Sequence, residues 1–234
     1  MTAHALNCMR LQMRNWKVTA LVPCLDEKDR IGDVLKVLIN SANIDDILVV
    51  DDGSTDGTSG AVKKFKSVKL LRLEKNIGKG GAIKKGLKQV TSEVTLLIDV
   101  DLKGLTNEKI GSMVTPVTNE GYDVCIGVLK RGPNWFQYLR KNVLPLMSGE
   151  RAIKTKILNK ILENSLAQEW GIEFYMNLFI KKKKLKLKKI DLVGVDDIRH
   201  FRKKGFKVYF KRLLFFWIIN IKLFWLSLVW QEAD

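Results

Sequence analysis

Short, almost continuously apolar runs alternate along this chain with segments of amphipathic spacing, and that alternation restricts its fold most strongly. A run such as residues 47–50 is too short and too β-branched for a helix. Strands that are apolar on both faces occur where helices cover both sides of a mostly parallel sheet. We therefore predict an α/β fold with a doubly wound central sheet. The expected strands are residues 17–22 (ended by Pro23), 47–50, 68–73, 94–98, 122–128 and 186–195.

Helices are expected between these strands. Residues 26–40 place Ile31, Val34, Leu35 and Leu38 at the spacing of one helix face. Neither an internal repeat nor a linker interrupts the chain before about residue 130, so one domain is expected over this part. The other expected helices are residues 58–65, 80–90, 109–117, 152–163 and 172–180.

The charge of the chain is strongly positive, with 41 Lys and Arg against 25 Asp and Glu, a net +16. Residues 181–234 hold 15 of the bases and 5 of the acids. Such an excess indicates an anionic partner, which is a nucleic acid, an acidic membrane or a phosphorylated substrate. Cys8, Cys24 and Cys125 form no CxxC pair, which favours reduced, buried thiols and a cytoplasmic location.

Two acidic clusters follow apolar strands. Asp51 and Asp52 open a turn rich in Gly, Ser and Thr, and residues 99–101 read Asp-Val-Asp. Carboxylates at i and i+2 project to one side of an extended chain, and oxygen ligands suit Mg²⁺ or Mn²⁺ held with a nucleotide diphosphate. The alternative is a solvated turn with a helix cap. Because both clusters end strands of one sheet, we predict a donor and metal site there.

Four motifs carry a resemblance to a known family: PCLDE, VVDDGSTDGT, NIGKGGAI and IDVD, in order between residues 17 and 128. They resemble the family 2 glycosyltransferases of GT-A fold, a Rossmann-like three-layer sandwich. Within the family the chain looks most like the dolichyl- or polyprenyl-phosphate sugar synthases and the related glucosyl-phosphoglycerate-synthase-like enzymes. Asp26 departs from the motif, in which Asn is usual.

The resemblance implies roles for residues on the donor side. His200 follows the last expected strand, where relatives place a histidine that holds metal or diphosphate; a structural histidine is the alternative. The metal implied is Mg²⁺ or Mn²⁺, on Asp99, Asp101 and His200. The implied donor-binding residues are Pro23, Leu25, Glu27, Asp52, Lys79, Gly80 and Asp99.

A weaker match follows on the acceptor side. Residues 148–151, Ser-Gly-Glu-Arg, resemble the acceptor loop, and residues 171–173, Gly-Ile-Glu, a later motif. Asp101 and Glu173 are the implied catalytic residues. A hydroxyl acceptor needs a base, Glu173 or Glu150, whereas a phosphate is already an anion at neutral pH and needs cations. The expected acceptor-binding residues are Lys130, Arg131, Gly149, Glu150 and Arg151, with Lys154 as a further loop cation.

The C-terminal segment, residues 213–230, is mostly apolar and would measure about 27 Å as a helix. It follows a basic, aromatic stretch typical of a membrane surface. It predicts membrane association on the cytoplasmic face, by spanning or by lying on the bilayer; a buried helix or homodimer contact is the alternative. We expect an extension at 1–16, the catalytic domain at 17–205 and a membrane segment at 206–234.

The resulting prediction is a metal-dependent glycosyltransferase, of the hexosyltransferase type. It moves a sugar from a UDP- or GDP-sugar to a polyprenyl or dolichyl phosphate. A soluble enzyme with a small phosphorylated acceptor is the first alternative, and a non-catalytic basic membrane-binding protein the second. A nucleotidyltransferase is disfavoured because no glycine-rich loop follows the first strand. Residues 181–189 are taken as a solvated face rather than a nucleic-acid patch.

Overall fold

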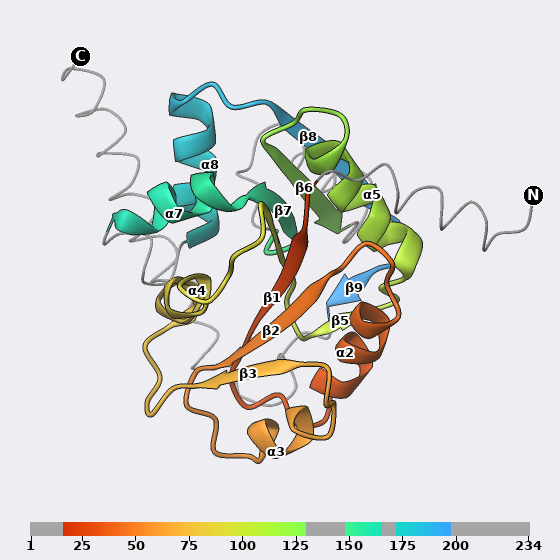
Figure 1. Cartoon of the computed structure of the whole chain (residues 1–234), viewed down its shortest axis with the longest axis vertical. Coiled ribbons are helices and arrows are strands. Elements are labelled where there is room, and N and C mark those ends of the chain that lie inside the picture. The colour runs from red at the N-terminus through yellow and green to blue at the C-terminus, as the bar shows by residue number, and fades with distance from the viewer. Residues whose placement is uncertain (1–15, 130–147, 165–171, 198–234) are drawn as a thin grey trace, which may run out of the picture. The chain divides into compact units, whose positions relative to one another are not determined.

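The computed structural model describes residues 16–129, 148–164 and 172–197, and within these ranges seven strands form one sheet. Their order is β3-β2-β1-β4-β7-β6-β8, and only the pairs made by β7 are antiparallel (Figure 1). The predicted mostly parallel sheet is thus confirmed. The strands are β1 (Val18–Cys24), β2 (Asp46–Asp51), β3 (Lys69–Arg72), β4 (Val94–Leu97), β6 (Val124–Leu129), β7 (Arg151–Lys154) and β8 (Leu187–Leu192).

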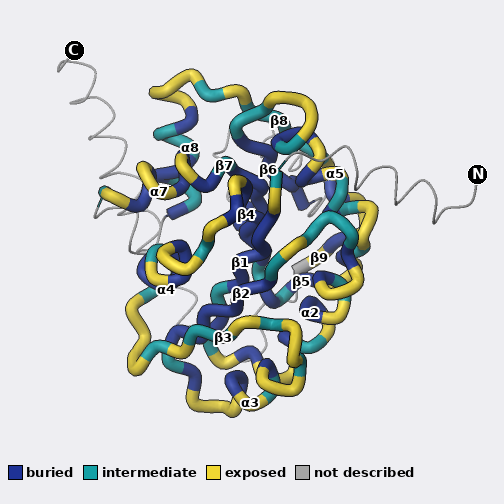
Figure 2. Tube along the Cα trace, viewed as in Figure 1, coloured by how far each residue is buried: buried dark blue, intermediate teal, exposed yellow. Residues whose placement is uncertain are grey.

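Helices cover both faces of this sheet (Figure 1). On one face lie α2 (Ile31–Ile39), α3 (Thr58–Val62) and α5 (Asn107–Thr118); on the other lie α4 (Lys79–Leu87), α7 (Thr155–Glu163) and α8 (Ile172–Lys182). The strands supply both cores by alternation: in β2, Ile47 and Val49 join the first core, and Leu48 and Val50 the second. Burial is highest in the strands between the two layers (Figure 2), which confirms the three-layer sandwich.

Two local predictions were wrong. Pro23 was expected to end the first strand, but it lies inside β1, opposite Val50. Only residues 18–21 of β1 pair with β4, so the missing N–H of Pro23 removes no bond on that side. Residues 152–154 were expected in a helix but belong to β7. They are inserted between β4 and β6, and the helical spacing of apolar residues begins only at Ile157.

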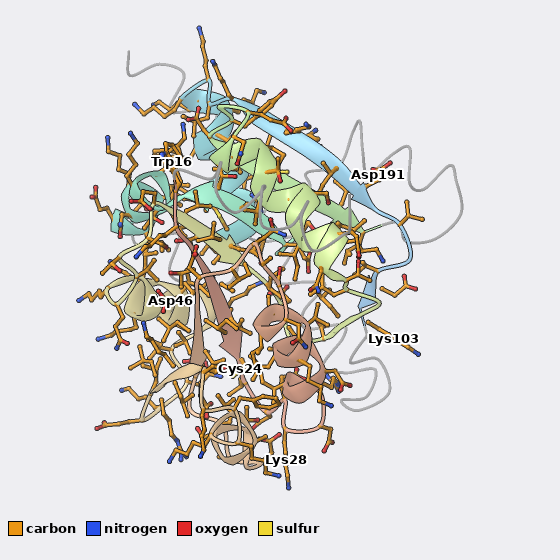
Figure 3. The ribbon with its side chains drawn as sticks, turned by 45° about the vertical axis from the view of Figure 1, so that its right-hand side comes forward. Trp16, Cys24, Lys28, Asp46, Lys103 and Asp191 are labelled. Carbon is orange, nitrogen blue, oxygen red and sulfur yellow. The ribbon has the colours of Figure 1, made fainter. Side chains whose placement is uncertain are left out.

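The predicted site residues lie at one end of the sheet, the edge formed by the carboxyl ends of its parallel strands. Strand order reverses between β1 and β4, and ligands of such sheets bind beyond the carboxyl ends of the strands at this point. Because β7 runs antiparallel and pairs Arg151 with Leu97, residues 148–150 reach the same edge. Figure 3 marks the two ends of β1, with Trp16 before the strand and Lys28 beyond its carboxyl end. A small second sheet joins β5 (Leu102–Lys103) to β9 (Asp196–Asp197).

The predictions about the cysteines and the membrane segment can be examined only in part, because some of their residues lie outside the described ranges. Cys24 and Cys125 are free and buried, as predicted, and burial raises the pKa of both thiols; Cys8 lies outside. Within the described ranges no helix has the length and apolarity needed to cross a bilayer. The C-terminal segment 213–230 is outside those ranges. The domain boundary near residue 205 therefore stays a prediction.

Candidate active site

Asp52 joins the end of β2 to the loop before α4. Its Oδ1 accepts the backbone N–H of Ile77 at 2.8 Å and its Oδ2 that of Gly78 at 3.0 Å. The residue is 4% exposed. Burial raises the pKa of its carboxyl, and the two backbone donors act against that rise. Each oxygen retains a further lone pair for a ligand. Asp52 therefore fixes residues 77–78 beside the strand end, where its predicted contact with the donor base would occur.

Asp51 is a structural residue, so its grouping with Asp52 as a donor and metal ligand was wrong. The side chain is fully buried. Its carboxylate accepts the backbone N–H of Ser54 at 2.9 Å and the hydroxyl of Ser59. Both oxygens therefore close the turn after β2 and hold the start of α3. Of the pair, only Asp52 stays available to a ligand.

The loop after β1 packs against this turn. Asp26 has a left-handed backbone, φ 55°, which Asp and Asn both tolerate. Its Oδ1 accepts the N–H of Thr55 at 2.9 Å. An Asn Oδ1 could accept the same bond, so the departure from the family motif is compatible with this turn. Pro23 and Leu25 are half-buried, whereas Glu27 is buried and its carboxylate pairs with Arg30 at 2.7 Å.

Lys79, the first residue of α4, lies between two carboxylates from distant parts of the chain. Its Nζ is 2.7 Å from Asp99 Oδ1 and 2.6 Å from Glu173 Oε1. Burial would lower the pKa of Lys79, but the two carboxylates outweigh it and raise that pKa. For Glu173, burial acts to raise the pKa, but the charge of Lys79, its hydrogen bond and the weaker charge of Arg151 together lower the pKa below its usual value. Both side chains are therefore charged at neutral pH.

The loop before β7 closes over this ion pair. A Cβ on Gly149 would lie 2.3 Å from Asp99 Oδ2 and 2.8 Å from Lys79 Nζ, so a side chain there would displace the ion pair that the glycine backbone approaches. Glu150 is 2% exposed, and its carboxylate accepts the hydroxyl of Ser148. Burial, and then the charge of Asp99, raise the pKa of Glu150 to about 7. The predicted acceptor loop thus contacts the predicted donor side.

Arg151, predicted to bind the acceptor, is fully buried in this structure, and its contact with an acceptor stays a prediction. Its Nε donates to the Ser148 carbonyl at 2.8 Å, and one terminal nitrogen donates to Asn177 Oδ1 at 2.8 Å. The other donates to the carbonyl of Glu173 at 3.3 Å. Burial lowers its pKa to about 10, which leaves the guanidinium charged at neutral pH. Arg151 therefore fastens the acceptor loop to α8.

Lys154 was expected beside the acceptor and lies elsewhere. It ends β7 opposite Val94, the first residue of β4, and so belongs to the far edge of the sheet. Its Nζ pairs with Asp123 at 2.7 Å and lies 5.4 Å from the centre of the Trp16 ring. The other two expected acceptor cations, Lys130 and Arg131, lie outside the described residues.

The Asp-Val-Asp triplet forms the turn between β4 and β5. Asp99 and Asp101 are partly exposed, whereas Val100 is buried. Among the described residues, no three His, Cys, Asp or Glu side chains converge as a metal site. Carboxylate oxygens with the rest of the shell left to water and phosphate do fit Mg²⁺ or Mn²⁺. Both oxygens of Asp99 contact Lys79. His200 lies outside the described residues.

Sequence reasoning overlooked Asn177. It lies four residues after Glu173 on α8, and its amide oxygen accepts from the buried Arg151. The i, i+4 spacing from a motif residue, on the same helix face, was the only signal that could have pointed to it. Its role depends on Arg151 being inside the protein, which the sequence does not state.

Solved structures with the same fold include a glucosyl-3-phosphoglycerate synthase. Glucosyl-3-phosphoglycerate synthase from Mycobacterium tuberculosis, in complex with Mn²⁺, UDP-glucose and phosphoglyceric acid, superposes with a TM-score of 0.67 at 20% identity. The match covers 86% of this chain and 77% of that one. The same enzyme with Mg²⁺ and UDP gives a TM-score of 0.68 at 19% identity, with the same two shares covered. At this identity the likeness establishes the GT-A fold.

The sequence comparisons also identify the family. The model of Glycosyl transferase family 2 matches residues 19–210, so the chain belongs to that family and is a glycosyltransferase. An uncharacterized protein of Methanocaldococcus jannaschii is 30% identical over 224 residues, covering 85% of this chain and 91% of that protein. This relative thus spans nearly the same length, without adding an activity.

Two relatives with named activities match over shorter stretches. Dolichyl-phosphate beta-glucosyltransferase of Dictyostelium discoideum is 30% identical over 102 residues, 37% of this chain and 31% of that protein. Undecaprenyl-phosphate 4-deoxy-4-formamido-L-arabinose transferase of Serratia proteamaculans is 28% identical over 142 residues, 56% of this chain and 43% of that protein. The chain therefore spans less than half the length of these two relatives.

Proposed function

We propose that this glycosyltransferase moves a sugar from a UDP- or GDP-sugar to the phosphate of a polyprenyl or dolichyl phosphate, with Mg²⁺ or Mn²⁺. The observation that carries the choice of acceptor is the ion pair of Glu173 with Lys79, 2.6 Å apart. A carboxylate whose pKa is lowered is a poor proton acceptor. A phosphate acceptor needs no base, because its second pKa is about 6.

Glu150 is the other expected base, and its position does not suit that role. Its pKa of about 7 would favour proton transfer. However, the side chain is 2% exposed and accepts from Ser148, so an acceptor hydroxyl does not reach it in this conformation. Among the described residues, the geometry therefore supports an acceptor that arrives already ionised. Glu173 then acts by holding Lys79 rather than by moving a proton.

The donor would occupy the edge between Asp52 and Lys79. Residues 77–78 are fixed by Asp52, and α4 begins directly after them, so its first N–H groups and Lys79 face the position of the nucleotide phosphates. Pro23 and Leu25 would line the base pocket, and Glu27 would support it from inside. Asp99 would face the sugar or ribose. This assignment keeps each predicted donor residue on one edge of the sheet.

Asp101 and His200 would hold the metal, which when bound stabilises the negative charge of the departing diphosphate. The last residue of β9, Asp197, pairs with Leu102, the residue after Asp101. His200 is three residues further along the chain, outside the described residues. In the reaction an acceptor phosphate oxygen bonds to the anomeric carbon. The bond from that carbon to the diphosphate breaks, and the diphosphate oxygen keeps the electron pair.

Membrane association on the cytoplasmic face, through the C-terminal segment 213–230, completes this proposal. Two relatives are named for acting on dolichyl and undecaprenyl phosphates, which are membrane lipids. A second candidate acceptor is a small phosphorylated molecule. It is supported by the phosphoglyceric acid bound in the solved structure of the same fold.

Transfer assays with the full chain test both acceptors. The protein is incubated with UDP-glucose or GDP-mannose and Mn²⁺, together with polyprenyl phosphate, unphosphorylated polyprenol or 3-phosphoglycerate. We expect sugar in the organic phase with polyprenyl phosphate and none with polyprenol. Transfer to 3-phosphoglycerate alone would select the second candidate. Equal transfer to polyprenol and polyprenyl phosphate would contradict the phosphate-acceptor argument.

A further inference from the structure

The helix layer made by α4, α7 and α8 carries an unbalanced set of lysines on its outer side. These helices pack on one face of the sheet, and α7 contacts both of the others (Figure 1). Among the described residues of this layer and its helix ends, one acid, Glu163, is exposed. We call the following set the lysine face: Lys84, Lys85, Lys88, Lys156, Lys160, Lys181, Lys182, Lys183 and Lys184, of which all but the half-exposed Lys84 are exposed.

The opposite helix layer also has exposed lysines after a helix, Lys63, Lys64 and Lys66, but exposed acids accompany them there: Asp29, Asp33, Asp56 and Glu108. On α2 the exposed Asp33 and Lys36 lie 3.6 Å apart, and on α5 the exposed Glu108 precedes the half-exposed Lys109. Solvated helices commonly alternate charges in this way. The lysine face instead presents nine cations against one acid, which makes it complementary to a polyanionic surface.

We infer that the lysine face docks the catalytic domain on a bilayer that contains anionic phospholipid. All nine cations are Lys, the compact point charge typical of polybasic membrane contacts, and none is the Arg that forks onto individual phosphates. None of the aromatic side chains of these helices within the described residues is exposed, so no stacking platform for nucleic-acid bases is present there. A broad lipid surface needs neither feature.

The position of the face relative to the active site supports the same partner. Lys79 begins α4 and Glu173 lies in the first turn of α8, and both helices run away from the site. Lys181 lies eight residues after Glu173, about 12 Å along the helix. A bilayer under the lysine face would therefore pass close to the catalytic groups. This docking does not depend on the proposed transfer reaction, and it is separate from the C-terminal segment.

Vesicle sedimentation with the full chain tests the inference. The vesicles contain phosphatidylcholine alone or with about one third phosphatidylglycerol. One variant replaces four exposed lysines of the face: Lys85→Gln, Lys88→Gln, Lys156→Gln and Lys160→Gln. The control removes the same charge from the opposite layer and the residues after α3: Lys36→Gln, Lys63→Gln, Lys64→Gln and Lys66→Gln. Calorimetric binding of UDP, with Mn²⁺, verifies that both variants are folded.

Binding to the anionic vesicles should fall on the order of a hundredfold in the first variant, since each lysine near an acidic membrane contributes a several-fold factor. The control should lose less than about threefold, because its lysines lie away from the docked face. Equal losses in the two variants would show that only net charge matters and would overturn the inference. So would undiminished vesicle binding by the first variant, or loss of its binding to a single-stranded RNA while vesicle binding persists.

Discussion

The two acidic clusters of the active site are held in place by different kinds of contact. Asp51 and Asp52 receive backbone N–H groups and a hydroxyl from residues 54–78, within 26 positions of themselves. Asp99 instead faces a side-chain cation, Lys79, whose second partner, Glu173, lies 94 positions away from it. The first cluster is therefore organised by local sequence, whereas the second exists only after distant segments have packed together.

This difference explains what each cluster can do. Backbone donors fix a carboxylate without adding a mobile charge, which suits a rigid pocket for a nucleotide. Lys79 of α4 pairs with Asp99 of the turn after β4 and with Glu173 of α8. These ion pairs couple the donor and acceptor sides, because a change of charge at one residue shifts the electrostatics of the others. Substitutions in the first cluster should therefore act on geometry, and substitutions in the second on charge.

The largest effect is expected from Asp101→Asn, which keeps the shape of the side chain and removes the charge for the metal. Transfer activity should fall at least about a hundredfold, because the leaving diphosphate would lose its metal-assisted stabilisation. Mn²⁺-dependent binding of UDP, measured by calorimetry, should weaken in parallel. Asp196→Asn, on the exposed part of β9, removes the same charge nearby and should retain activity. Equal losses in both variants would assign the effect to general electrostatics.

Gly53→Ala tests the rigid cluster. Gly53 has φ +80°, and an added Cβ would lie 2.8 Å from the backbone N of Asn76 and C of Lys75. Backbone strain and the clash together should lower the free energy of unfolding by about 2–4 kcal/mol. Donor affinity should also decrease, since the clash moves the loop that Asp52 holds. Gly121→Ala is the matched control: φ is +76° with nothing within 4 Å, so only the strain of about 1–2 kcal/mol is expected.

Denaturant unfolding separates the two glycine variants. If Gly53→Ala costs no more stability than Gly121→Ala, the loop of residues 75–78 adapts freely and the first cluster is not rigid. The proposed difference between a rigid Asp51–Asp52 cluster and a charge-coupled Asp99 cluster would then be wrong.

The cluster held by local contacts was predicted from the sequence more fully than the cluster held by distant ones. The turn of residues 51–58 and the flanking strands were predicted because their signals are local: apolar runs, glycines and side chains that cap a turn. Even there, the sequence did not separate Asp51 from Asp52. Which of two adjacent carboxylates is buried depends on the direction of the strand end and on Ser59 of α3.

The second cluster was predicted only as a set of motifs. Gly149 and Glu173 were assigned to the acceptor side, and the ion pair that joins them to the donor side depends on where β7 enters the sheet. Residues 152–154 were taken for a helix, so that entry was missed, and Arg151 was placed in a loop. An arginine bordered by Glu150 looks like a surface residue until the packing of α8 supplies Asn177 as its buried partner.

Lys79→Met tests the second cluster, the charge-coupled group of Lys79, Asp99 and Glu173. The variant removes the cation that lies between Asp99 and Glu173 and leaves Arg151 as the remaining nearby charge. The free energy of unfolding should fall by about 2–3 kcal/mol after allowance for partial exposure. Without Lys79 the pKa of Glu173 would rise in the folded state, so the lost stability should return as the pH falls and this carboxyl takes up a proton. Lys69→Met breaks an exposed pair with Asp46 and should cost at most about 1 kcal/mol. Urea unfolding at pH 8 and pH 5 measures both.

The smallest effect, and the sharpest in its pH dependence, is expected from Glu150→Gln. Burial and the charge of Asp99 raise the pKa of Glu150 from 4.5 to about 7, so the folded protein binds this proton more tightly than the unfolded chain does. Stability of the native protein should therefore fall as the pH rises from about 4.5 to 7 and change little above that range. The drop from this group amounts to about 3 kcal/mol. Glutamine cannot ionise, so the variant should lack this slope.

At pH 8 the Glu150→Gln variant should consequently be as stable as the native protein or more so, because a neutral amide can still accept from Ser148 without the cost of a buried charge. Its transfer activity separates two roles. If Glu150 only supports the loop, activity persists; if it removes a proton from a hydroxyl acceptor, activity is lost at every pH. The second result would make Glu150 the catalytic base and contradict the phosphate acceptor. It would also show that a residue next to the Asp99–Lys79–Glu173 ion pair removes the proton, so that this region would both catalyse the transfer and connect the donor and acceptor sides.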